Sequence, residues 1–109
     1  MPYDESLGLR IQKILSNRPG LEQKKMFGGV GFILNGNMTC GVHKDFLIVR
    51  VGPQRYQAAL DQPHAGMFDM TGRPMTGWVK VTSPGFDSDA VLTTWIELGW
   101  EYALSLPPK

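Results

Sequence analysis

Cysteine is almost absent from this 109-residue chain: Cys40 is the single one, so no internal disulfide can form. A lone thiol is typical of a reducing compartment, and we therefore expect a cytoplasmic protein. No stretch approaches the roughly 20 consecutive apolar residues of a membrane-spanning helix. Residues 1–5 also lack the basic and apolar segments of a signal peptide. The sequence therefore predicts neither a disulfide-stabilised protein nor a membrane protein.

An excess of one charge is also missing, because the formal net charge is only +1. Such a balance argues against a dedicated nucleic-acid binder and against a polybasic membrane anchor. The charge is unevenly divided, however: residues 1–55 hold eight basic and four acidic side chains, and residues 56–109 hold three and six. The positive excess gathers early in the chain, at Arg10, Lys13, Arg18, Lys24 and Lys25. This cluster is a candidate for nucleic-acid phosphate contacts, for contacts between protomers, or for a solvated surface.

Motifs of catalysis and metal binding are missing as well. The sequence has no G-x-S-x-G, no H-E-x-x-H and no placeable pair of carboxylates. Cys40 and His43 form a C-x-x-H pair, but a separation of three on a strand puts their side chains on opposite faces. We expect no catalytic residue, no metal and no cofactor, and we interpret Cys40 as a small buried hydrophobe. Gly28-Gly29-Val30-Gly31 looks like part of a phosphate loop, but a strand follows it and a bend is the simpler interpretation.

Glycine and proline are plentiful, at 13 and 8 residues, and they predict many tight turns between short elements. Hydrophobic spacing predicts a first helix capped by Asp4 or Ser6, a short second helix, and a last helix capped by Asp87 or Ser88. Period-two runs predict strands over 30–34, 38–43, 46–51, 67–70 and 78–81. Asn35-Gly36 favours a type I′ hairpin turn. The result is one α+β domain over residues 1–109: two layers in the order α-β-β-β-α-β-β-α, with a five-stranded antiparallel sheet.

Both faces of this predicted sheet carry large apolar side chains. In the strand over 46–51, for example, Leu47, Val49 and Val51 point to one face of the sheet, and Phe46 and Ile48 point to the other. If the helices cover one face, the other face needs a partner. We predict a homodimer through a face that contains Ile33, Phe46, Ile48 and Trp78. The alternative is that a loop or the long last helix covers that face.

Several motifs resemble those of one known family, the TfoX N-terminal domain. Lys25-Met26-Phe27-Gly28-Gly29-Val30-Gly31-Phe32 is similar to that family's MFGG-x-G opening. The Asn35-Gly36-Asn37-Met38 turn, the strand over 45–51, Gly72-Arg73-Pro74-Met75 and the final helix with Trp95 follow in the same order. The resemblance covers about residues 5–105, nearly the whole chain.

The resemblance implies a two-layer α-β3-α-β2-α domain, similar to the YgaC-like and secretion-chaperone-like folds. Full-length members of the family are regulators of natural competence, thought to act with the cyclic-AMP receptor protein, and they carry a second, C-terminal domain. We expect this chain to be a stand-alone N-terminal domain without it. The family supplies no catalytic residues, and its motif residues look architectural. If the two motif loops meet at one end of the sheet, they would form a recognition surface from Phe27, Gly28, Gly29, Arg73, Pro74 and Met75.

We therefore expect a non-enzymatic, regulatory protein-interaction module, with a partner in the transcription machinery as the resemblance implies. One alternative is a small-ligand-binding domain or cryptic enzyme that uses a pocket between residues 26–31 and 72–77. Another is a weak nucleic-acid binder that uses residues 10–25, although that segment lacks the aromatic side chains on which single-stranded bases stack.

Overall fold

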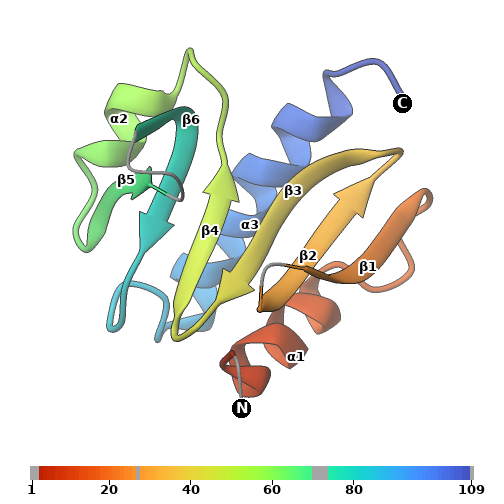
Figure 1. The fold of residues 1–109 in the computed structure, drawn as a ribbon, viewed down its shortest axis with the longest axis horizontal. Coiled ribbons are helices and arrows are strands. Elements are labelled where there is room, and N and C mark those ends of the chain that lie inside the picture. Colours follow the sequence, from red (N-terminus) through yellow and green to blue (C-terminus); the bar gives the residue numbers. More distant parts are fainter. Residues whose placement is uncertain (1–2, 27, 70–73, 109) are drawn as a thin grey trace.

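In residues 3–26, 28–69 and 74–108, which the computed structural model describes, three helices pack on a six-stranded antiparallel sheet (Figure 1). The helices are α1 (Glu5–Ile14), α2 (Tyr56–Leu60) and α3 (Asp89–Leu104). The strands are β1 (Leu21–Met26), β2 (Gly29–Leu34), β3 (Asn37–His43), β4 (Phe46–Arg50), β5 (Ala65–Asp69) and β6 (Pro74–Val81). Their order across the sheet is β1-β2-β3-β4-β6-β5. The predicted α+β class with an antiparallel sheet is confirmed.

The prediction of five strands is wrong, because β1 is a sixth strand at the edge of the sheet. Its sequence, LEQKKM, is mostly polar and shows no alternation that would identify a strand. Leu21 pairs with Leu34 of β2 and packs against the core, whereas the side chains of residues 22–25 are exposed. Charged side chains are common on edge strands because they discourage pairing with other chains. Pairing with β2, rather than its own hydrophobic pattern, therefore makes this segment a strand.

Local signals at the ends of the elements are as expected. The Asp4 carboxylate accepts a hydrogen bond of 3.1 Å from the backbone N–H of Leu7 and caps α1. The Ser88 hydroxyl accepts one of 3.5 Å from the N–H of Val91 and caps α3. Asn35 and the glycine after it have φ angles of 51° and 87°, which a type I′ turn requires between β2 and β3.

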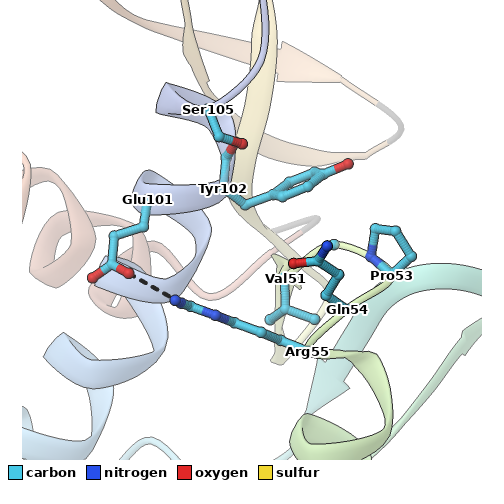
Figure 2. A pocket seen from close by; sticks show the side chains of 8 residues that line it. Val51, Pro53, Gln54, Arg55, Glu101, Tyr102 and Ser105 are labelled. Carbon is cyan, nitrogen blue, oxygen red and sulfur yellow. Dashed lines mark hydrogen bonds and ion pairs between the residues drawn. The ribbon is translucent and has the colours of Figure 1, made fainter.

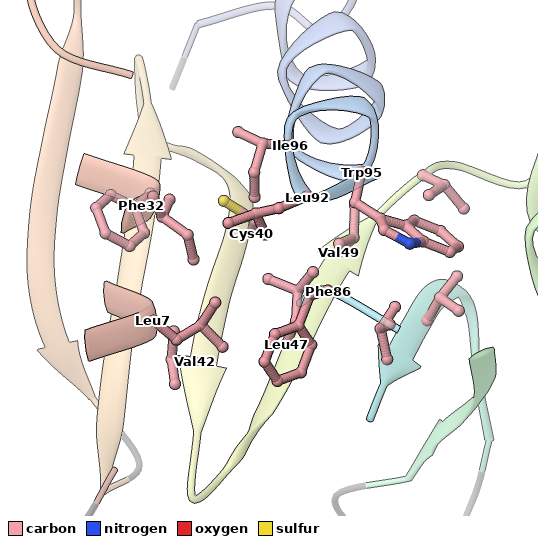
Figure 3. Close-up of a cluster of buried hydrophobic side chains, with 14 of the residues drawn as sticks. Leu7, Phe32, Cys40, Val42, Leu47, Val49, Phe86, Leu92, Trp95 and Ile96 are labelled. Atoms are coloured by element: carbon pink, nitrogen blue, oxygen red, sulfur yellow. The ribbon is translucent and has the colours of Figure 1, made fainter. Parts of the chain in front are cut away.

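The core lies between the sheet and the helices, which all pack on one sheet face (Figures 1 and 3). Leu7 and Ile11 of α1 and Leu92 and Ile96 of α3 are at most 1% exposed. From the sheet, the core receives alternate residues of the central strands, including Val30, Phe32, Cys40, Val42, Leu47, Val49, Val79 and Val81. No helix of the described residues has the length and apolar character needed to cross a bilayer.

Candidate functional site

The sheet face turned away from the helices carries the four residues predicted for the dimer interface. Ile33 of β2 follows the buried Phe32, and Phe46 and Ile48 alternate with core residues of β4, so all three point to this face. Trp78 joins them, because it pairs in register with Arg50, the next residue of β4 on the same side. No helix of the described chain covers this face, which turns toward the viewer in Figure 1.

Four aromatic rings form a row on this open face, one from each of four strands. The ring of His43 meets that of Phe46 edge-on at a centroid distance of 5.4 Å. The Phe46 ring lies 6.4 Å from that of Phe68, which lies 6.4 Å from that of Trp78. Tilted pairs at such distances contribute about 0.5–1.5 kcal/mol each beyond simple burial. Phe68, whose ring lies between the other two, is 5% exposed, whereas Phe46 and Trp78 are half-buried.

Two cations lie over the outer surfaces of these rings. The Lys80 ammonium is 4.7 Å from the centre of the Phe46 ring. The Arg50 guanidinium is 5.4 Å from the centre of the Trp78 ring and 5.4 Å from that of Tyr102. Cations bind the negative faces of aromatic rings, and their alkyl stems cover apolar surface. The open face is therefore an apolar surface with positive charges over its rings.

The two loops that carry the family motifs lie at opposite ends of the sheet, so the predicted recognition surface is wrong in its geometry. Gly29 starts β2 and pairs with His43, at the end where β3 turns into β4. Pro74 and Met75 start β6 at the far end, where β4 finishes, because β6 runs antiparallel to β4. The proposed pocket between these loops is excluded for the same reason. Phe27 and Arg73 lie outside the described residues.

The glycine at the start of β2 has an architectural role, as predicted. A Cβ on Gly29 would collide with the backbone carbonyl oxygen of Val42 on the neighbouring strand. Gly28, just before it, has a φ of +73°, a left-handed value that other residues rarely adopt. The motif therefore allows the chain to turn sharply into the sheet at this point.

The arginines of the early basic cluster are engaged within the protein. The Arg10 guanidinium donates to the carbonyl oxygens of Phe86 (2.9 Å) and Asp87 (3.1 Å), and to the Asp89 carboxylate at 2.9 and 3.2 Å. Arg18 donates two hydrogen bonds, of 2.7 and 2.6 Å, to the carboxylate of Glu97. Both arginines therefore tie the first part of the chain to α3.

The lysines of that cluster do not share one surface. Lys24 and Lys25 are neighbours on β1, so they point to opposite faces of the sheet. Lys24 lies 3.4 Å from Glu22 on the open-face side, and Lys13 is exposed on α1 in the other layer. This dispersal disfavours a nucleic-acid surface on residues 10–25.

A family model for the TfoX N-terminal domain matches residues 13–103, which run from within α1 through all six strands to the last turn of α3. The chain belongs to the TfoX N-terminal domain family. No curated protein and no solved structure matches the chain. The family resemblance of the sequence motifs is thus confirmed.

The one thiol of this TfoX N-terminal domain is deeply buried. Cys40 is 0% exposed in the core, and burial raises its pKa to about 12, although a hydrogen bond of 3.4 Å from the Thr39 hydroxyl opposes the rise. A thiol with such a pKa is protonated at neutral pH and is a poor nucleophile. The interpretation of Cys40 as a buried hydrophobe is confirmed. In the described residues, no three His, Cys, Asp or Glu side chains are grouped where they could hold a metal ion.

Sequence reasoning missed several residues that shape the open face of this TfoX N-terminal domain. The place of Arg50 on this face could have been predicted from the alternation of β4, since Arg50 follows Phe46 and Ile48 at every second position. Lys80 and Phe68 were not, because their positions depend on how β5 and β6 pair with β4. That pairing joins segments separated by α2, and no local pattern reports it.

Proposed function

We propose that this TfoX N-terminal domain is a cytoplasmic, non-enzymatic protein-interaction module that forms a homodimer through the open sheet face. The observation that supports this most is the set of half-buried apolar side chains on that face: Ile33, Met38, Phe46 and Trp78. An apolar surface that no helix of the described residues covers is typical of an interaction site. Covering it would remove these side chains from water at about 25 cal/mol per Å².

A second copy of the chain suits this face because its two halves are complementary. Rings and cations, including Phe46, Trp78 and Arg50, lie on the β4–β6 half. Ile33 lies on the β2 half, and Glu22 of β1 pairs with it in register and so points to the same face. In a two-fold dimer each half can meet the other half of its partner, so that aliphatic side chains contact rings and the Glu22 carboxylate exchanges Lys24 for the partner's cations.

Family membership supports a regulatory role for this module. A TfoX N-terminal domain is consistent with a competence-related regulator, and we propose a second partner in the transcription machinery. In a dimer formed by the sheet faces, the helix layers of both copies would remain free for such a partner.

Sedimentation velocity on the full chain at tens of micromolar tests the dimer. We expect a species of twice the 12.1 kDa chain mass. Ile33→Glu, which puts a charge in the interface, should give a monomer of unchanged circular dichroism. Leu9→Glu is the matched control, because Leu9 is a 61% exposed apolar residue on α1, away from the sheet face. A wild-type protein that sediments only as a 12.1 kDa species would contradict the proposal.

A second candidate function is favoured by the alternation of rings and cations on the same face. Arg50 lies on Trp78, and Lys80 lies on Phe46. Proteins that bind single-stranded nucleic acids use this combination, in which cations contact the phosphates and aromatic rings stack on the bases. A mobility shift with a single-stranded oligonucleotide at 50 and 200 mM salt tests it. Binding should weaken in Lys80→Gln and remain in Lys13→Gln, and binding equal in both variants excludes the face.

A further inference from the structure

Two cavities lie end to end along the side of α3 that faces α2, and Arg55 lines both. The lower cavity, of about 370 Å³, is mostly apolar and is lined by Ala58, Ala59, Val91, Trp95 and Leu98. The upper cavity, of about 390 Å³, lies between residues 51–55 and the last turns of α3, with Glu101, Tyr102 and Ser105 (Figure 2). Both volumes are in the range of small-molecule sites. We refer to the two cavities together as the α2–α3 groove.

The boundary between the two cavities is an ion pair. The Arg55 guanidinium donates to the Glu101 carboxylate at 3.0 Å, and Figure 2 shows the arginine reaching across to α3. The two side chains are 52% and 57% exposed. Pairs so exposed add little to stability, so both charges can turn to a ligand with almost no loss.

The walls around this ion pair are held in place before any ligand arrives. The backbone N–H groups of Val51 and Gly52 both donate to the carbonyl oxygen of Gly77, at 2.8 and 3.1 Å. The Tyr102 ring packs so closely on Gly52 that a Cβ there would collide with it. A site that is already formed loses less entropy when it binds.

A cation and an anion side by side, next to an apolar cavity, complement a dipolar ion with an apolar tail. We propose that the α2–α3 groove binds a free aliphatic α-amino acid. The ligand carboxylate accepts hydrogen bonds from Arg55, whose planar guanidinium suits that shape. The ligand ammonium donates to Glu101, and the aliphatic side chain enters the lower cavity.

The lower cavity has the room and the chemistry for that side chain. Ala58 and Ala59 present only methyl groups from α2, which leaves space opposite Leu98 of α3. Val91 is 46% exposed at the cavity wall, so a bound aliphatic group would cover apolar surface that now meets water. The groove lies in the helix layer, away from the open sheet face. Binding of an amino acid in the groove therefore does not require the proposed homodimer.

Titration of the ¹⁵N-labelled full chain with L-leucine, followed by amide chemical shifts, tests the site. We expect saturable shifts at Arg55, Ala58 and Glu101. 4-Methylpentanoate and 3-methylbutylamine carry the same tail with one charge each, and should bind at least about tenfold more weakly because one charge-assisted hydrogen bond is lost. Glycine, which lacks the tail, should cause no saturable shift. An equal affinity for 4-methylpentanoate, or no saturable shift with L-leucine up to 20 mM, overturns the proposal.

Two variants probe the two halves of the groove separately. Glu101→Gln removes the partner of the ammonium, and Ala58→Leu fills the lower cavity from an exposed position that tolerates a larger side chain. Each should weaken L-leucine binding at least about tenfold while the circular dichroism spectrum stays the same. Glu5→Gln, an exposed carboxylate on α1, is the matched control and should bind as the wild type does. Sedimentation of the same samples reports the dimer separately, so the two proposals can fail independently.

Discussion

Arg18 and Glu97 form a bidentate ion pair that joins the segment after α1 to the middle of α3, with nitrogen–oxygen distances of 2.7 and 2.6 Å. The Arg18 guanidinium also lies 4.9 Å from the centre of the Trp100 ring. The hydrogen bonds between the two side chains raise the pKa of Arg18 and lower the pKa of Glu97. These contacts hold the guanidinium in one position, so we expect this ion pair to contribute more to stability than a single-contact pair on the surface.

The Arg18–Glu97 pair should make stability depend on pH in the acid range. Because the pKa of Glu97 is lowered in the folded state, its contribution is complete above the ordinary carboxyl pKa and is lost as the pH falls through the lowered one. Glu97→Gln should therefore lower the free energy of unfolding by about 1 kcal/mol at pH 7, a value that allows for partial exposure. Urea unfolding from pH 7 to pH 3 should show this difference shrinking.

Glu22→Gln is the control for that experiment, since Glu22 forms an exposed pair with Lys24 at 3.4 Å. Its free energy of unfolding should stay within about 0.5 kcal/mol of the wild type at every pH. A difference between Glu97→Gln and the wild type that is the same at pH 3 and pH 7 would show that the loss is not electrostatic.

Arg10 should resist replacement by lysine. Its guanidinium reaches the carbonyls of Phe86 and Asp87 and the carboxylate of Asp89 together, and an ammonium cannot match that spread of acceptors. Arg10→Lys should therefore lower the free energy of unfolding by about 1–3 kcal/mol, nearly as much as Arg10→Ala. Lys13→Ala, one turn further along α1, should change it by less than about 0.5 kcal/mol. Urea unfolding at pH 7 distinguishes these outcomes, and a lysine variant as stable as the wild type would contradict the argument.

These contacts also explain the uneven charge of the two halves of the sequence. Arg10, Arg18 and Arg55 belong to the basic half, and their partners Asp89, Glu97 and Glu101 all belong to the acidic half, on α3. Three of the eight basic side chains in the first half of the chain thus form ion pairs with carboxylates of the second half. Sequence alone left this open, because pairs separated by as many as 79 residues depend on how α1 and α3 pack.

The elements of the fold that depend on residues close in sequence were predictable. Those that form only because one strand pairs with another were not. Asp4, Asn35-Gly36 and the alternation from Phe46 to Arg50 fix a cap, a turn and a strand through interactions close in sequence. β1 is polar and becomes a strand only through β2. The open face was predictable from the alternation around Phe46, Ile48 and Trp78, but the places of Phe68 and Lys80 beside them depend on how β5 and β6 pair with β4.

Gly99 of α3 should not tolerate a larger side chain. A Cβ there would collide with the backbone carbonyl oxygen of Thr39, because helix and strand touch at this point. Overpacking against backbone costs roughly 1–3 kcal/mol, and the gain in helix propensity offsets about 1 kcal/mol of that. We therefore expect Gly99→Ala to lower the free energy of unfolding by about 1 kcal/mol, the difference between the two effects at their middle values. Gly66→Ala on β5, where a Cβ would meet no atom within 4 Å, should change it by less than about 0.5 kcal/mol.

The rate at which a reagent labels the Cys40 thiol measures how often the core around it opens. The thiol's pKa of about 12 and its complete burial predict that a thiol reagent at pH 8 modifies the native protein only when the molecule unfolds. The same reagent should react within seconds in 6 M guanidinium chloride. Because labelling then follows the population of the open state, Gly99→Ala should speed it about tenfold for each 1.4 kcal/mol of lost stability, and Gly66→Ala should not. Rapid labelling of the native wild type would instead mean that the sheet opens around Cys40 without global unfolding.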